Sequence, residues 1–325
     1  MKNIFSLLLL GSLGLGACKT NSAKHTKNQH VSAIDKDSIL TRIQKQTFNY
    51  FWEGAEPVSG LARERIHIDG VYPENDPNVI TIGGSGFGLL STLVGMERGF
   101  IQKNEGQTRI AQALAYLGNA ERFQGAWSHW YYGETGKVKA FSAKDNGADL
   151  VETAFMAQAL ICIREYYKNG DTDQQKLAQQ ADDLWKGIDW DFFRNGKDVL
   201  FWHWSPTAGW GMNHAIQGYD ECLITYILAA SSPTHPIPAS TYHKGWARNG
   251  EIKTTIEKFG IPTILKHNAK PGEVGPLFWE HYSYLGLNPF GLQDRYADYS
   301  QVTQNHVKIN LAYAEANPLN IKGYG

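Results

Sequence analysis

The chain of 325 residues carries a formal net charge of −1 and has no block of basic residues, so we do not expect it to bind nucleic acid. Its 10 tryptophans and 16 tyrosines exceed what a core needs, and many stand beside Asp, Glu, His or Asn. Flat apolar rings bordered by polar groups suit sugar rings, which favours a carbohydrate ligand. No CxxC or HExxH pattern indicates a metal site, and we expect no metal and no cofactor.

The first 17 residues have the layout of a secretory signal peptide. Lys2 precedes an apolar run of about a dozen residues, which is too short for a membrane-spanning helix. The segment from Leu15 to Cys18 resembles the bacterial lipobox, whose cysteine is lipidated and becomes the mature N-terminus. An ordinary signal peptide with a small-residue cleavage site is the alternative. We therefore expect an exported lipoprotein, anchored in a membrane at Cys18 and facing the periplasm, with residues 18–36 as a flexible tether.

Helical periodicity dominates the rest of the chain, residues 37–325, whose length is enough for one large domain. We expect helices at 37–52, 83–96, 105–117, 149–167, 172–190 and 217–230, and helical segments in the second half of 242–259 and within 275–287 and 294–316. Loops rich in Gly, Pro, Asn and aromatic residues separate them. Short strand-like pieces at 65–68 and 199–202 are compatible with small hairpins.

Half-polar helices alternate along the chain with helices that are apolar on nearly every side. A helix that is apolar all round must be enclosed by protein, whereas an amphipathic helix can face water. The alternation predicts an all-α fold in which an outer ring of helices encloses an inner ring. A solenoid and a globular helical bundle are the alternatives, although no fixed repeat length favours a solenoid. A double ring is built from pairs of helices, but the number expected here is odd. Residues 321–325 also form no helix that could pack against the rest of the fold, so we expect the chain to be truncated at its C-terminus.

The segment 142–167 combines an acidic loop with an apolar helix. The loop brings Asp145, Asp149 and Glu152 to the start of that helix. Asp149 as N-cap with Glu152 three residues later would form a capping box, which is a purely structural role. Alternatively, one of these acids faces a cleft and acts as a catalytic carboxylate. The two interpretations are compatible, and the local sequence leaves both open.

Four later segments carry a family resemblance: GWGMNH to YDE (209–221), SPTHPIP (232–238), PLFWEHYSYLGLNP (276–289) and YADY (296–299). They resemble the bacterial glucoamylase-like domain, whose characterised members include the β-1,2-glucanases of glycoside hydrolase family 144. The resemblance runs from about residue 39 to the end. It implies an (α/α)6 barrel, incomplete here over 37–325, and a glycosidase that hydrolyses β-1,2-glucan or β-1,2-linked gluco-oligosaccharides with inversion.

By motif match, the carboxylates important in that family fall on Asp145, Asp149, Glu152 and Glu221. Glu221 stands at the start of an apolar helix, where burial could hold its proton, so it is the leading candidate for the general acid. By the helix rules alone, it could equally be an acid that complements the helix dipole. Asp145 and Asp149 are candidates for positioning water or for binding sugar hydroxyls. A base carried beyond residue 325 is the alternative.

The candidate substrate-binding residues are aromatic or histidine side chains near polar groups: Trp127, Trp130, His203, Trp204, Trp210, Trp279, His281 and Tyr282. Core packing, or a structural role for the histidines, is the alternative for each. Of the remaining cysteines, Cys162 and Cys222 are expected to be buried free thiols. We expect a monomer that binds a glucan. The competing functions are a hydrolase or lyase of another linkage, and a glycan-binding lipoprotein without turnover.

Overall fold

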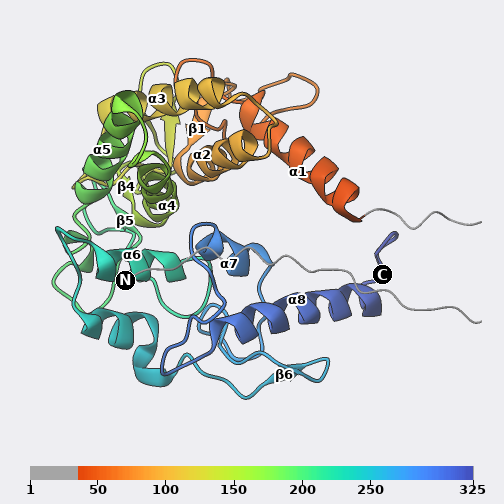
Figure 1. Cartoon of the computed structure of the whole chain (residues 1–325). Coiled ribbons are helices and arrows are strands. Elements are labelled where there is room, and N and C mark those ends of the chain that lie inside the picture. Colours follow the sequence, from red (N-terminus) through yellow and green to blue (C-terminus); the bar gives the residue numbers. More distant parts are fainter. Residues whose placement is uncertain (1–35, 325) are drawn as a thin grey trace, which may run out of the picture. The chain divides into compact units, whose positions relative to one another are not determined.

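The computed structural model describes residues 36–324 (Figure 1). Two units divide the chain, residues 1–40 and 41–325, and the fold below belongs to the second. The expected signal peptide, Cys18 and nearly all of the tether lie outside the described residues. No helix among the described residues is long and apolar enough to cross a membrane.

Helices supply most of the regular structure in the described part of the chain. The α-helices are α1 (Lys36–Trp52), α2 (Ile82–Glu97), α3 (Lys103–Asn119), α4 (Leu150–Tyr167), α5 (Thr172–Lys186), α6 (Leu223–Ser231), α7 (Phe278–His281) and α8 (Tyr299–Ala316). Shorter turns of 3-10 or π-helix are η1 (Phe192–Arg194), η2 (Thr241–Trp246), η3 (Arg248–Gly250) and η4 (Tyr282–Tyr284). The all-α expectation is confirmed, and α1 to α5 confirm the first five expected helices.

Two expectations about helices need correction. The helix expected from residue 217 begins six residues later, at Leu223, because the loop before it carries Gly218 at a φ of 100° and the acids at 220 and 221. The second half of 242–259 is not helical. Phe259 and Gly260 both have positive φ there, and they close a hairpin of two short strands.

Three small antiparallel sheets join the loops. β1 (Val79–Thr81), β2 (Trp130–Tyr132) and β3 (Val138–Lys139) form one, β4 (Ala148–Asp149) and β5 (His203–Trp204) the second, and β6 (Glu257–Lys258) and β7 (Ile261–Pro262) the third. The strand-like piece at 65–68 forms no strand, and of 199–202 only Phe201 pairs, with Ala215. The second sheet matters most for the site, because it aligns Asp149 with His203.

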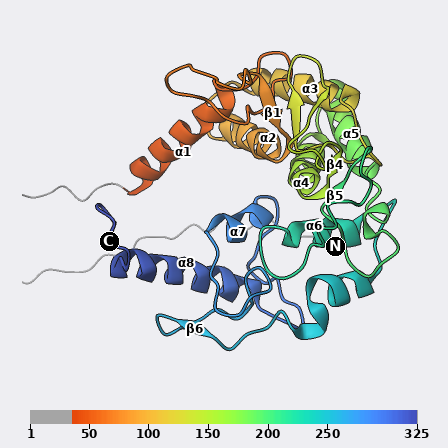
Figure 2. The ribbon, with the colours of Figure 1, turned by 180° about the vertical axis from the view of Figure 1, so that it is seen from behind.

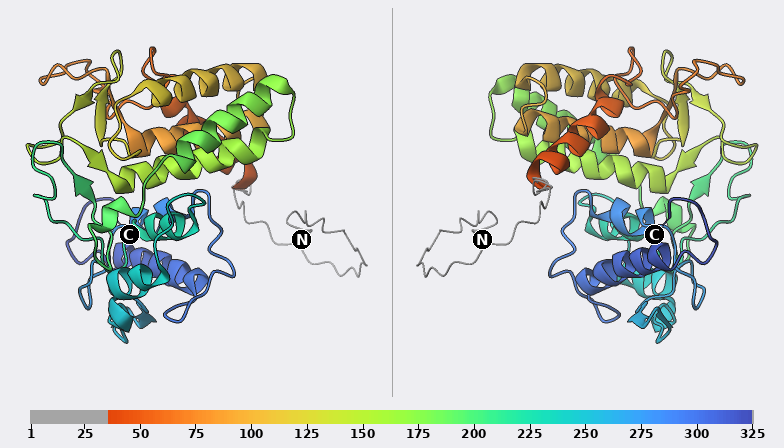
Figure 3. Two further views of the ribbon diagram at one scale, coloured as in Figure 1. Left: turned by 90° about the vertical axis from the view of Figure 1, so that its left-hand side faces the viewer. Right: turned by 90° about the vertical axis from the view of Figure 1, so that its right-hand side faces the viewer.

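The centre of the fold is the packing of α4. This helix lies between α2 and α5 (Figures 2 and 3), and most of its side chains are buried. Gly86 lets α2 approach closely, since a Cβ there would lie 2.6 Å from the backbone oxygen of Phe155. The polar faces of α3 and α5 are exposed while α2 and α4 lie beneath them. The expected alternation of inner and outer helices is therefore present in this part of the fold.

Candidate active site

Asp149 is the most heavily bound acid of the site. It caps α4, where its Oδ1 accepts the backbone N–H groups of Val151 at 3.0 Å and Glu152 at 2.9 Å. The same oxygen accepts Nε1–H of Trp202 at 2.9 Å, and Oδ2 lies 2.9 Å from Nδ1 of His129. The side chain is wholly buried. A carboxylate with four partners and no exposed surface suits the positioning of other groups better than direct attack on a substrate.

Glu152 does not complete the expected capping box. The backbone N–H of Asp149 donates to the carbonyl of Trp127 instead, at 2.8 Å. The Glu152 carboxylate reaches across to the start of α2, where Oε2 accepts the N–H of Gly83 at 2.7 Å and the hydroxyl of Thr81 at 3.2 Å. Burial raises the pKa of Glu152, and Asp149 adds to that effect. The N-cap role of Asp149 is thus confirmed, whereas Glu152 takes no part in capping its own helix.

Asp145 comes from the loop before β4 and joins Asp149 through a histidine. Nε2 of His203 lies 3.4 Å from Oδ2 of Asp145 and 3.7 Å from Oδ2 of Asp149. His203 itself is only 8% exposed, and its Nδ1 has no hydrogen-bond partner. The sequence suggested that His203 binds substrate. In the structure its Nε2 lies against the two aspartates, and little of its surface is open to a substrate.

The four groups carry different charges because their surroundings differ. Burial raises the pKa of Asp145 to about 7, and the negative charge of Asp149 adds to this. Burial also opposes the ionisation of Asp149, but the hydrogen bond and charge of His129 outweigh it and lower its pKa. Burial disfavours the cation of His129 too, yet Asp149 raises its pKa to about 9. Burial lowers the pKa of His203. At neutral pH the cluster therefore holds a cationic His129 and an anionic Asp149.

Glu221 lies just before α6 and is partly exposed. Burial raises its pKa to about 7, with smaller contributions from Asp220 and from Glu152. Glu152 and Glu221 also both raise the pKa of Tyr282, after the larger effect of burial. The two glutamates and Tyr282 therefore lie within electrostatic reach of one another. The structure brings this expected acid into the neighbourhood of Glu152.

A cavity of about 310 Å³ lies beside Glu152 and Tyr282. Its lining includes Glu152 and Tyr282 together with Tyr50, Phe87 and Phe155. Arg63 borders it too, with its guanidinium held by the carbonyl oxygens of residues 54, 55 and 77. An aromatic hollow with a few fixed polar groups is the usual form of a site for a small polar molecule.

The aromatic candidates fall into two groups. Trp127 is wholly buried and donates its indole N–H to the carbonyl of Leu117, so the prediction that it binds substrate is wrong: it belongs to the core. The other candidates are partly or fully exposed: Trp130, Trp204, Trp210, Trp279, His281 and Tyr282. Trp204 and Trp210 pack on Phe192, and Trp130 packs on Phe141. Among the candidates, Tyr282 alone lines the cavity described above.

Sequence reasoning missed His129 and Trp202, which both bind Asp149. His129 lies 20 residues before its partner, and Trp202 lies 53 residues after it. The one available signal was that each stands in an aromatic run, WSHWYY or FWHW, beside predicted substrate-binding residues. No spacing rule links positions so far apart.

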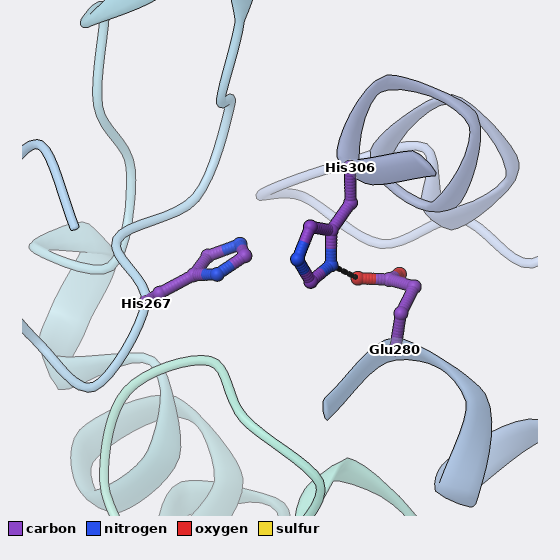
Figure 4. A group of neighbouring side chains, drawn as sticks. All are labelled: His267, Glu280 and His306. Carbon is purple, nitrogen blue, oxygen red and sulfur yellow. Dashed lines mark hydrogen bonds and ion pairs between the residues drawn. The ribbon is translucent and has the colours of Figure 1, made fainter. Parts of the chain in front are cut away.

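A second group of buried ionisable side chains lies near α7 and α8 (Figure 4). His306 contacts Glu280 through Nδ1 at 3.1 Å and the carbonyl of Gly275 through Nε2 at 2.6 Å. Nδ1 of His267 accepts the N–H of Gly275 at 2.8 Å. The other Glu280 oxygen accepts the hydroxyls of Tyr219 and Thr303, at 2.5 and 2.8 Å. These bonds link the segments that carry His267, Glu280 and His306, which is a structural role.

The two cysteines in the described residues, Cys162 and Cys222, are both free. Cys222 is buried and Cys162 is half-buried. The expectation of unpaired thiols is confirmed.

A family model and several proteins of known structure are similar to this chain. Residues 213–325 match the family model described as "Glycoamylase: Putative glucoamylase". An endo-β-1,2-glucanase from Chitinophaga pinensis, solved with sophorotriose and glucose, is 57% identical and superposes with a TM-score of 0.88, over 90% of this chain and 70% of that one. The chain belongs to the glucoamylase-like family.

Two further relatives of this glucoamylase-like chain come from Parabacteroides distasonis. An exo-β-1,2-glucooligosaccharide sophorohydrolase acting at the non-reducing end is 39% identical over 318 residues. A crystal structure of a β-1,2-glucanase is 37% identical over 89% of this chain and 43% of that one, with a TM-score of 0.81. The first match extends over 92% of this chain but over only 43% of that curated relative. The likeness in structure agrees with the expected α/α-barrel arrangement.

Proposed function

We propose that this protein hydrolyses β-1,2-glucan or β-1,2-linked gluco-oligosaccharides with inversion. The observation that carries the proposal is the 57% identity with an endo-β-1,2-glucanase that was solved with sophorotriose and glucose. The site supports it, because Glu152, whose pKa is raised by burial, lines an aromatic cavity, and its charge reaches both Asp145 and Glu221. That combination meets the needs of glycoside hydrolysis, which requires paired carboxyl groups and surfaces for sugar rings.

In the proposed reaction Glu221 is the general acid that protonates the leaving glycosidic oxygen. Its pKa of about 7, raised by burial, keeps a proton available near neutral pH, and its partial exposure leaves room for a substrate. On the opposite face of the sugar, inversion needs a carboxylate that activates water. Asp145 and Glu152 are the candidates for that role, since both oxygens of Asp149 are already bound.

The sugar chain is proposed to occupy the hollow beside Glu152, with Tyr282 as one of its walls. Glucose has apolar C–H faces that stack on aromatic rings, and its hydroxyls bond to fixed polar groups. Trp130 and Trp279 are half-exposed and remain candidates for further sugar contacts. His281, which is exposed, is a candidate for bonding to hydroxyls.

We further propose that the protein is an exported, monomeric lipoprotein, anchored through Cys18 and facing the periplasm. The support is the signal-like segment and its lipobox-like end. Metabolic labelling with a fatty acid in a bacterial host should label the wild type and leave Cys18→Ser unlabelled. Equal labelling of both proteins would remove Cys18 from this role.

The test of activity is incubation of the protein with linear β-1,2-glucan, with β-1,3-glucan as the control. We expect new reducing ends and short β-1,2-linked products from the first glucan and none from the second. Proton NMR during the first minutes should show the α-anomer forming first, as inversion of a β-linkage requires. Ultraviolet-absorbing unsaturated ends would identify a lyase. Tight binding without new reducing ends would identify a glycan-binding protein.

A further inference from the structure

We propose that His129 is a positioning residue of the site, the counter-ion shared by Asp145, Asp149 and Glu152 at the start of α4. This inference rests on the proposed function, because it assigns a role within that reaction. Its geometric basis is the 2.9 Å contact between Nδ1 of His129 and Oδ2 of Asp149. A ring nitrogen of His129 and one carboxylate oxygen each of Asp145 and Asp149 lie within 4.8 Å of one another.

The acids of this cluster have few other cations to rely on. In the described part of the chain, the ion pairs of Asp145 and Asp149 are made with histidines alone, and no Lys or Arg pairs with them or with Glu152. His203 is the second histidine, but burial lowers its pKa and so disfavours its cation. The positive charge of the cluster at neutral pH therefore lies on His129.

The surroundings of His129 fix its position as well as its charge. Asp149 is held in place by Trp202 and by the first N–H groups of α4, so it presents Oδ2 to the imidazole in one orientation. The imidazole packs against the rings of Trp130 and Phe141, with centroids 5.6 and 4.5 Å away. Its side chain is 24% exposed. The His129 cation lies between two aromatic rings and a carboxylate whose two oxygens are both hydrogen-bonded, so it has little freedom to move.

His129 acts on each candidate catalytic acid of the cluster. Its charge lowers the pKa of Asp145, of Asp149 and of Glu152, against the burial that raises each of them. Other ionisable groups within electrostatic reach are His203, which also interacts with His214, then Cys222 through Asp149, and Glu221 and Tyr282 through Glu152. Without His129, the remaining charges are mainly carboxylates that repel one another, and they would take up protons at a higher pH.

The expected consequence is a shift in the pH–rate profile. The acidic limb of kcat/KM reports protonation of the base, so His129→Gln should move that limb upward by about one pH unit or more. The matched control is Trp202→Phe, which removes a neutral donor to the same carboxylate. That control should leave the limb where it is, even if the rate falls. His129→Lys restores a cation at this position and should return the limb part of the way.

A measurement that does not use activity separates this inference from the proposed function. In the wild-type protein labelled with ¹⁵N-histidine, the His129 nitrogens should titrate near pH 9, where Asp149 and its neighbours place the pKa. Titration near the ordinary value of 6.5 would overturn the role of His129 whether or not the protein cleaves glucan. An unmoved acidic limb in a folded His129→Gln variant would overturn it too. If His129→Gln fails to fold, the titration of the wild type still decides.

Discussion

Glu152 on α4 accepts the backbone N–H of Gly83, in the first turn of α2, across a distance of 2.7 Å. The N-terminus of a helix carries partial positive charge and free N–H groups, so it stabilises a carboxylate placed there. The bond joins the two inner helices that pack most closely and fixes an acid that lines the cavity. The position of Glu152 thus depends on a residue 69 positions earlier in the chain.

Gly83→Ala tests that dependence. A Cβ at this position would lie 2.5 Å from Oε2 of Glu152 and 2.9 Å from Cδ2 of Phe155, so the carboxylate must move. We expect kcat to fall by about tenfold or more, because catalytic groups tolerate little displacement. The control is Gly118→Ala on α3, where an added Cβ meets nothing within 4 Å. It should leave kcat unchanged and raise stability by about 0.5–1 kcal/mol. Equal kcat values in the two variants would show that Glu152 need not stay in place.

Glu221→Gln tests the acid. The amide keeps the shape and polarity of the side chain but cannot give a proton to the leaving oxygen. We therefore expect kcat to fall by about 10² or more while the affinity for β-1,2-gluco-oligosaccharides changes little. Reducing-end assays give the rate, and isothermal titration calorimetry gives the affinity. A variant that turns over at the wild-type rate would remove Glu221 from the acid role.

The same variant should change the pH dependence of stability. The pKa of Glu221 is raised from 4.5 to about 7 by burial, so the folded state holds more protons than the unfolded state between these values. Folding stability contributed by the protonated group is complete below pH 4.5 and is lost as pH rises towards 7. Glu221→Gln should therefore stabilise the protein at pH 8, by on the order of 2 kcal/mol, and leave it nearly unchanged at pH 4. Urea unfolding at the two pH values measures this. Equal effects at both would contradict the raised pKa.

Asp149 and Asp171 form a matched pair of helix caps. Each accepts two N–H groups in the first turn of its helix, but Asp149 is also bound by His129 and Trp202, whereas Asp171 is exposed. Asp171→Ala should cost about 1 kcal/mol, the usual value of a lost cap. Asp149→Ala should cost roughly 3 kcal/mol or more, since it leaves buried partners unsatisfied. Urea midpoints measure both, and equal losses would show that His129 and Trp202 add nothing to stability.

Some parts of the site could be predicted because they depend on neighbours in the chain. The N-cap role of Asp149 follows from its spacing to the first turn of α4, and that half of the capping box is confirmed. The second half is wrong, because Glu152 bonds to Gly83, and a spacing rule within one helix carries no information about another. Trp127 and Trp130 stand in one aromatic run, yet the first is wholly buried and the second half-exposed. Both residues are tryptophans in the same run, so only their packing in the fold distinguishes them.

The sequence by itself determined α1 to α5, because apolar periodicity and capping are local and bury the same faces in any fold of this class. Only the tertiary structure decided the charges of the site. His129 reaches Asp149 because β2 and the loop before it lie against the start of α4, and His203 reaches it because β5 pairs with β4. Burial and Coulomb interactions depend on distances in space, and those distances join residues far apart in the chain.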